Sequence, residues 1–141
     1  MADTVATHVL AQTTTHIVVH LTNISDGTGE AAVVKVDKST LLASDAAEPA
    51  SLDIERVIWN CDGMAARILW DHTTDDFAFA LSGSGDMDFR AGGLGLPVVP
   101  APGILADPRS AGATGDILLT TTGHTAGDTY NIILLLRKQP D

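Results

Sequence analysis

The stretch TTHIVVHL, from Thr14 to Leu21, decides the fold class. Its apolar residues Ile17, Val19 and Leu21 fall on one face of an extended chain, and His16, Val18 and His20 fall on the other. A period of two is typical of a half-buried β-strand, and the β-branched Ile-Val-Val run favours the same conformation. The stretch therefore predicts a strand with an apolar face toward a core and a mostly polar outer face.

Similar runs, each bounded by Gly, Asp, Asn, Ser or Pro, continue along the chain: VATHVLAQ, AAVVKVD, LDIERVIWN, MAARILWD, DDFAFALS, GDILLTTT and TYNIILLLRK. Together they predict about eight strands. Only KSTLLASDAAEPA favours helix, as a short turn capped by Ser39 and stopped by Pro49. A chain of 141 residues is the size of one domain. We therefore expect an all-β protein, a single antiparallel β-sandwich over residues 1–141 that resembles a jelly roll.

Three turns are predicted to close β-hairpins: Cys61-Asp62-Gly63, Asp71–Asp76 and Gly123–Asp128. The last lies in TTTGHTAGDTY, whose histidine, aspartate and hydroxyls are residue types that a hydrolase uses. Its glycines and branched apolar flanks are typical of a hairpin loop, and the sequence lacks the GxSxG pattern of a nucleophile elbow. We expect no catalytic role there. Trp59 and Trp70 lie on adjacent strands of the first predicted hairpin, so their rings can stack across it. We expect them to pack in the core; the alternative, a sugar-binding platform, would need both rings exposed.

Residues 83–114 are predicted to form a long loop and arm, rich in glycine and proline. Proline cannot donate to a sheet, so VVPAPGIL, residues 98–105, is expected to be an extended arm or edge whose apolar side chains need cover. A partner would supply this cover, or the arm folds back on its own domain. The segment GDMDFR combines alternating acids with an anchor residue, Phe89, and an arginine, as interfaces do. The alternative is a loop held by burial of Phe89. The candidate interface comprises Asp86, Met87, Asp88, Phe89, Arg90, Val98, Val99, Ile104 and Leu105.

No metal site is predicted. His16 and His20 are four residues apart, but in a strand that spacing separates them by roughly 13 Å, too far to share an ion. The segment Asp26–Glu30 has the composition of a calcium loop without its spacing, and we interpret it as a turn. His8 and His72 are expected at the surface. Cys61, the single cysteine, is expected to be buried.

Composition excludes several classes of function. The net charge of −10 would repel phosphates, and the 8 basic residues are scattered, so nucleic acid is not an expected partner. The sequence has no apolar run of membrane-spanning length and no secretory signal pattern. We expect a protein made in the cytoplasm, without a cofactor and without a membrane partner.

Four segments carry a family resemblance: VVHLTNISDGTGEAAVVKVD, DGMAARILWD, GDMDFRAGGLGLP and GATGDILLTTTGHTAGDTYNIILLLRK. They resemble small virion structural proteins of tailed bacteriophages, of the capsid decoration or cement type. The resemblance spans residues 17–138. It implies a β-sandwich or jelly-roll-like module that oligomerises as a trimer or dimer and binds the major capsid protein on the capsid surface, with no catalytic residues.

Two rival functions remain from the sequence. One is a jelly-roll enzyme that uses histidine and carboxylate metal ligands, and the other is a receptor-binding or glycan-binding β-module. Metal content after dialysis would separate the first from a structural protein, and glycan binding would separate the second.

Overall fold

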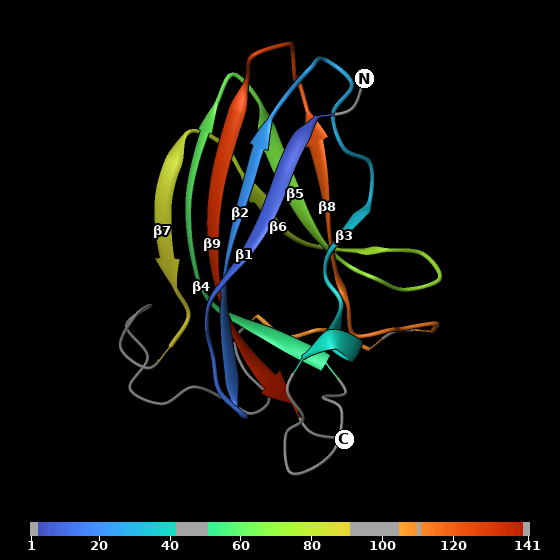
Figure 1. The fold of residues 1–141 in the computed structure, drawn as a ribbon. Helices are drawn as coiled ribbons and strands as arrows, with labels where there is room; N and C mark the ends of the chain where they lie inside the picture. The colour runs from blue at the N-terminus through green and yellow to red at the C-terminus, as the bar shows by residue number, and fades with distance from the viewer. Residues whose placement is uncertain (1–2, 42–50, 91–104, 110, 140–141) are drawn as a thin grey trace.

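The computed structural model describes residues 3–41, 51–90, 105–109 and 111–139, which form nine β-strands and one short 3-10 helix. Sheet A contains five strands in the order β1-β2-β9-β4-β7, and sheet B contains four in the order β3-β8-β5-β6 (Figure 1). All neighbouring strands are antiparallel. The elements are β1 (Thr4–Gln12), β2 (His16–Ile24), β3 (Val33–Val36), η1 (Lys38–Thr40), β4 (Ser51–Asp62), β5 (Ala65–Trp70), β6 (Asp76–Leu81), β7 (Ser84–Asp88), β8 (Ile117–Thr122) and β9 (Thr129–Gln139).

The two sheets pack face to face around an apolar core, so the predicted all-β sandwich is confirmed. Strand β2 keeps the predicted alternation, because Ile17, Val19 and Leu21 are each 1% exposed and the residues between them are partly exposed. Strand β9 contributes a matching inner row, and sheet B contributes Ile68, Trp70 and residues of β8. Burying one such side chain fully contributes about 1.5–3 kcal/mol of transfer free energy. The core is therefore built by alternation on both sheets.

Every predicted strand is present, but the loop prediction for residues 83–114 was wrong at its start. Residues Ser84–Asp88 form β7, which pairs with β4 at the edge of sheet A. Glycine and aspartate are uncommon in strands, so the sequence of β7 did not indicate one. Even so, Gly85 and Met87 alternate with Asp86 and Asp88 at the strand period. Gly85 is required because a Cβ there would lie 2.3 Å from the Trp59 ring. The small residue thus lets the indole lie against the strand.

Two of the three predicted hairpins are corrected. The turn at Asp71–Asp76 does join the paired strands β5 and β6. The Asp62-Gly63 turn instead links β4 of sheet A to β5 of sheet B, and the Gly123–Asp128 turn links β8 of sheet B to β9 of sheet A. Both are tight turns with glycines at positive φ, including Gly63 at 83° and Gly127 at 93°. The same turn residues serve a hairpin and a crossing between sheets, so turn chemistry alone cannot decide which strands pair.

Because β4 and β5 belong to different sheets, the two tryptophans pack differently from the prediction. Trp70 is 2% exposed in the core. Trp59 does not stack across a β4–β5 hairpin but lies edge-on to Phe79 of β6, with ring centroids 5.8 Å apart. Its Nε1 donates to the Ser82 carbonyl at 2.9 Å. Both indoles therefore pack in or against the core, as expected, although Trp59 does so through Phe79 of the other sheet.

The predicted helical turn is shorter and is capped differently. Only Lys38–Thr40 is helical, and Asp37 rather than Ser39 is its N-cap, since the Asp37 side chain accepts from the Ser39 N–H at 2.9 Å. Leu41 is already extended, and residues 42–50 lie outside the described part of the chain. Asp is as good a cap as Ser, which explains the shift. Cys61 is buried, as predicted.

The prediction that His72 lies at the surface was wrong, because its side chain is buried. Its Nε2 lies 2.7 Å from Asp107 Oδ1, and its Nδ1 lies 2.8 Å from Asp76 Oδ2. Burial lowers the pKa of His72, but the hydrogen bonds and charges of the two carboxylates outweigh it and raise the pKa above the ordinary value. The imidazole thus connects the β5–β6 turn to residues 105–109 in a way that no sequence pattern indicated.

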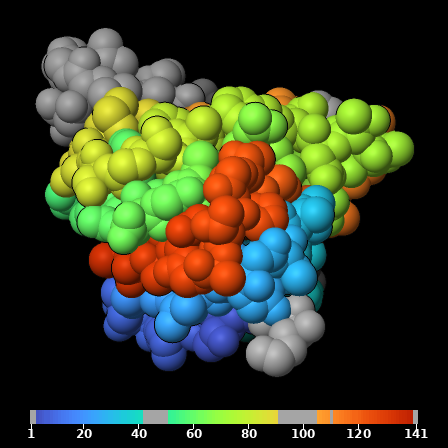
Figure 2. Space-filling model, turned by 90° about the horizontal axis from the view of Figure 1, so that it is seen from above, coloured from blue at the N-terminus to red at the C-terminus, as the bar shows by residue number. Residues whose placement is uncertain are grey.

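Strand β1 extends past the cover of sheet B. Val9 lies opposite Val19, and Val5 lies opposite Asn23, so each valine shares a face with a core-facing residue. Val19 and Asn23 are 1% exposed, whereas Val5 and Val9 are 45% and 55% exposed. Figure 2 shows the N-terminal strand at the margin of the molecule. The inner side of β1 is therefore left without the layer that covers the rest of sheet A.

Candidate functional site

The outer face of sheet A carries a shallow groove at its centre. Residues that point away from the core on β2, β9 and β4 line it: Val18, Ile133, Leu135 and Ile58, with Arg56 and Arg90 at one side. Its volume is about 170 Å³. Strand alternation puts Ile133 and Leu135 outside because their neighbours Ile132 and Leu134 fill the core. The groove is therefore an apolar surface formed by the opposite faces of core strands.

Two ion pairs form the rim of the groove beside β7. Arg56 Nε lies 3.0 Å from Asp86 Oδ1, and Arg56 Nη2 lies 2.5 Å from Asp86 Oδ2. Arg90 makes the same two-pronged contact with Asp88, at 2.9 and 2.7 Å. The hydrogen bond from Arg56 lowers the pKa of Asp86, and the hydrogen bonds from Arg90 lower that of Asp88. Bidentate pairing fixes the orientation of the guanidinium groups, so the rim presents an ordered, charge-balanced edge.

The predicted interface residues divide between the two sides of the sheet. Asp86, Asp88 and Arg90 come together at the groove rim. Met87 packs partly against the core. Phe89 is 7% exposed and lies edge-on to Phe79, with ring centroids 5.9 Å apart. The exposed-anchor prediction for Phe89 is therefore corrected, and the alternative of a segment held by its burial is confirmed.

The apolar arm is described only at its end. Leu105 is half-buried against the core, and its carbonyl accepts from the Ile54 N–H at 2.9 Å. This bridge ties the end of the arm to β4. Val98, Val99 and Ile104 lie outside the described residues. Of the arm, Leu105 alone can thus be assigned, to a position beside Ile54 of β4 with its side chain against the core.

Three histidines of β1 and β2 lie on the same outer face of sheet A as the groove. His20 lies beside His8 on β1, with ring centroids 6.2 Å apart, and its Nε2 is 3.3 Å from Asn131 Oδ1. His16 Nε2 is 2.7 Å from Glu55 Oε1. In the part of the chain that the structure describes, no group of three or more His, Cys, Asp or Glu side chains is arranged to hold a metal ion. The histidines are each engaged with a different neighbour.

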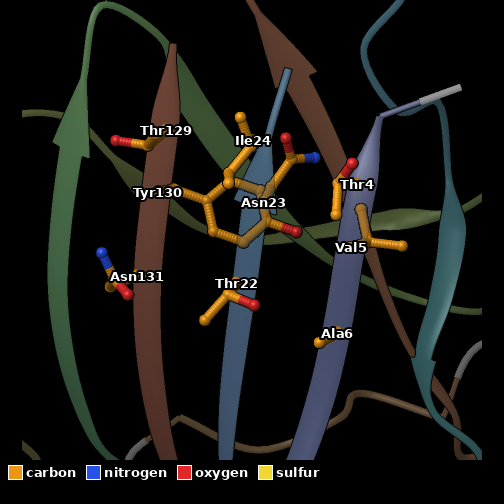
Figure 3. Close-up of a pocket in the computed structure, with 9 residues that line it drawn as sticks. All are labelled: Thr4, Val5, Ala6, Thr22, Asn23, Ile24, Thr129, Tyr130 and Asn131. Carbon is orange, nitrogen blue, oxygen red and sulfur yellow. The ribbon is translucent and has the colours of Figure 1, made fainter. Parts of the chain in front are cut away.

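A second hollow lies on the same sheet, where β1, β2 and β9 meet near the start of β1 (Figure 3). Its volume is about 360 Å³. Each strand contributes three consecutive residues, and the lining consists of Thr, Asn, Val, Ala, Ile and Tyr side chains without a single charge. Ile24 beside it is 56% exposed. On a chain of net charge −10, the lining of this hollow is therefore neutral, with hydroxyls, amides and apolar groups.

A buried polar network fixes that end of the sandwich. Glu30 Oε1 accepts from Tyr130 Oη at 2.6 Å and from Asn23 Nδ2 at 2.7 Å, and Glu30 Oε2 is paired with Lys35. Burial, together with the neighbouring Glu30, raises the pKa of Tyr130. The segment Asp26–Glu30, predicted to be a turn, ends in this network. A buried charge pair with these extra hydrogen bonds holds the loop in one arrangement.

Asp3 attaches the start of β1 to the same loop. Its carboxylate accepts from Asn23 Nδ2 at 3.0 Å and from the backbone N–H groups of Asp26 and Gly29 at 3.1 and 3.2 Å. Burial raises the pKa of Asp3, but these hydrogen bonds outweigh it and lower the pKa to about 2. At neutral pH the carboxylate is ionised and keeps the first residues of β1 in register with β2.

The groove was not predicted as a site, although the sequence contained a signal for it. The run IILLL, residues 132–136, is apolar at every position, so a strand made of it must be apolar on both faces. Which outward residues of β2 and β4 join it depends on sheet order, which local patterns do not encode. No helix of the described residues is long and apolar enough to cross a membrane.

Comparison with models of protein families, with curated protein sequences and with solved structures found no match for this chain.

Proposed function

We propose that the chain is a virion structural protein of a tailed bacteriophage, of the capsid decoration or cement type. It binds the major capsid protein on the outside of an assembled head, acts as a homo-oligomer, and stabilises the shell. The motifs that resemble such proteins motivate the class. The observation that carries the proposal is the outer face of sheet A, where an apolar groove with a charge-balanced rim lies on an otherwise acidic protein.

The groove has the composition that protein interfaces favour. Its centre is aliphatic, with Ile58 at 36% exposure, and its rim holds paired arginines and aspartates. Interface cores are depleted in charge, arginine is enriched in interfaces, and polar groups gather at the rim. A protein partner with a complementary apolar ridge would release water from the groove without leaving a buried charge unpaired. This arrangement favours binding to another protein over catalysis.

Strand order supports the jelly-roll part of the proposal. Leaving β1 aside, the orders are β2-β9-β4-β7 and β3-β8-β5-β6. In the first sheet of an eight-stranded jelly roll, the first strand pairs with the last, which is followed by the third and the sixth. Strands β2 to β9 follow that order when β2 is counted as the first. Viral capsid domains and lectins share this architecture. The strand order therefore agrees with the virion proposal and also with the rival glycan-binding module.

The experiment is to mix purified protein with phage heads that lack it. Co-sedimentation and a higher temperature of DNA release are expected, because a protein that binds only the assembled shell stabilises it by mass action. The proposal would be refuted if the protein stayed in the supernatant with all such heads.

A glycan-binding module is the second candidate, and the neutral hollow of Figure 3 favours it. Threonine hydroxyls and asparagine amides can donate to and accept from sugar hydroxyls. Glycan-array binding that is lost in Asn131→Ala would support this function. The enzyme alternative is tested separately, since stoichiometric zinc, iron or manganese in dialysed protein would favour it.

A further inference from the structure

Strand β1 differs from the other three sheet edges. Proteins usually protect edge strands with charges, short length or bulges. The other edges follow this rule, since β7 carries Asp86 and Asp88, β3 has four residues including Lys35, and β6 begins at Asp76. Strand β1 is nine residues long and contains no Asp, Glu, Lys or Arg. Its single irregularity is a bulge between Val9 and Ala11, which leaves the segment from Val5 to Val9 regular.

The regular segment also exposes apolar side chains on the overhanging inner face. Val5 and Val9 are 45% and 55% exposed there. Among the described residues, β2 is the only strand that pairs with β1. Within the described ranges, no strand lies beside the backbone groups of Val5–Val9 on the other side, so a further strand can pair there. An added strand would pair with this backbone, and a second inner face beside the first would shield both valines.

We propose that β1 pairs with β1 of a second copy of this chain, antiparallel and centred on Thr7. The segment VATHV is nearly symmetric about Thr7, so this register puts Val5 of each copy opposite Val9 of the other. Thr7 then lies opposite Thr7, and Ala6 lies opposite His8. Paired β-branched residues and paired threonines both stabilise antiparallel strands. The two-fold axis makes the contact self-complementary and closed.

Charge favours the same edge. Two copies of a chain with net charge −10 repel each other over most of their surfaces. Because β1 carries no charged residue, two copies can approach along this edge strand without bringing carboxylates together. Asp3, at its start, is already engaged with Asn23 and the backbone of the following loop. A second copy therefore suits this edge better than it suits the aspartate-bearing edge β7.

The pairing rests on the proposed function and makes it more specific. It makes the homo-oligomer a dimer and joins the docking faces of two chains. A two-fold axis normal to the sheet makes one continuous sheet from both copies, with the outer faces on the same side. The two apolar grooves then face the same direction. Two linked weak contacts hold a surface far more firmly than either one alone, because the second binding step is intramolecular.

Disulfide trapping tests the register directly. Residues directly opposite in an antiparallel pair have Cα atoms about 4.5–5.5 Å apart, within the range of about 4.4–6.8 Å that a disulfide needs. Thr7→Cys is therefore expected to give a covalent dimer under mild oxidation. Ser84→Cys, on the exposed edge β7, is the matched control and should stay monomeric on a denaturing gel. Wild-type protein, whose Cys61 is buried, controls for the native thiol.

Sedimentation in solution tests the surface without a new thiol. Wild-type protein is expected at twice the chain mass of 14.7 kDa, and Val9→Lys is expected to be a monomer. Val34→Lys changes a valine of similar exposure, 48%, on the edge strand β3, and should remain a dimer. A monomeric wild type, or cross-linking through Ser84→Cys and not Thr7→Cys, would overturn the pairing. Neither measurement uses a capsid, so the pairing can fail while shell binding stands, and the reverse.

Discussion

Strand β9 has apolar side chains on both faces, and the two faces meet different surroundings. On the inner face Ile132, Leu134 and Leu136 are fully buried between the sheets. On the outer face Ile133 and Leu135 are only half-buried and line the groove. The residue types are the same, so composition does not distinguish them. Folding of one chain buries the inner row completely, whereas the outer row lines the surface that we propose as the docking face.

The largest effect on stability is expected at Phe89, which the sequence suggested as an interface anchor and which the structure buries in the core. Phe89→Ala removes a core ring that packs on Phe79, so the free energy of unfolding should fall by about 3–5 kcal/mol. Denaturant unfolding measures it. A loss below about 0.5 kcal/mol, the range of exposed sites, would mean that the Phe89 side chain lies on the outer surface and not in the core.

Adjacent leucines of β9 give the matched test. Leu134→Ala should cost about 2–5 kcal/mol, because it opens a cavity in a filled core. Leu135→Ala makes the same chemical change one residue later, on the half-buried side, and should cost clearly less. Both variants are measured by urea unfolding at one pH. Equal losses would mean that the outer face is already covered within a single chain.

The pH dependence of stability tests two ionisable groups that folding buries, Asp53 and His72. Burial raises the pKa of Asp53 to about 6, although Gln139 donates to it, and the pKa of His72 is raised above 6.5. The folded state thus binds more protons than the unfolded state, so stability falls as pH rises. Asp53 contributes this loss between about pH 4 and 6, and His72 contributes it above pH 6.5.

Melting temperatures across that pH range should therefore decline from mildly acidic to mildly basic solution. Asp53→Asn should flatten the acidic part of the curve, and His72→Gln should flatten the part above pH 6.5. Asp62→Asn removes one carboxylate from an exposed turn and controls for net charge. Stability that rises with pH over this range in the wild type would contradict the raised pKa values.

The smallest effect on folding is expected at the groove rim. Arg56 and Asp86 are 37% and 45% exposed, and exposed ion pairs contribute little because water and salt screen them. Arg56→Gln and Asp86→Asn should leave the melting temperature nearly unchanged at low and high salt. A large loss of stability would show that the rim belongs to the fold rather than to the interaction surface.

Local patterns predicted every strand of the described residues except β7, but not how the strands assemble. Alternation at Ile17, Val19 and Leu21 identified β2, whereas the Asp62-Gly63 turn was assigned to a hairpin because the same residues also suit a crossing between sheets. The groove requires β2, β9 and β4 to be neighbours, and that order arises from contacts distant in sequence. Phe89 was misplaced because one aromatic in a glycine-rich segment gives no period. His72 was missed because its partner Asp107 is 35 residues away.

Shell binding by two matched surface variants tests the central claim most directly. Ile58→Glu puts a carboxylate in the groove on sheet A, and Phe77→Glu puts one on the outer face of sheet B, where the ring is 60% exposed. Both variants should remain folded by thermal unfolding. In sedimentation with heads that lack the protein, Ile58→Glu is expected to stay in the supernatant and Phe77→Glu to pellet like the wild type. Loss of binding in Phe77→Glu with retention in Ile58→Glu would contradict the assignment of the docking face to sheet A.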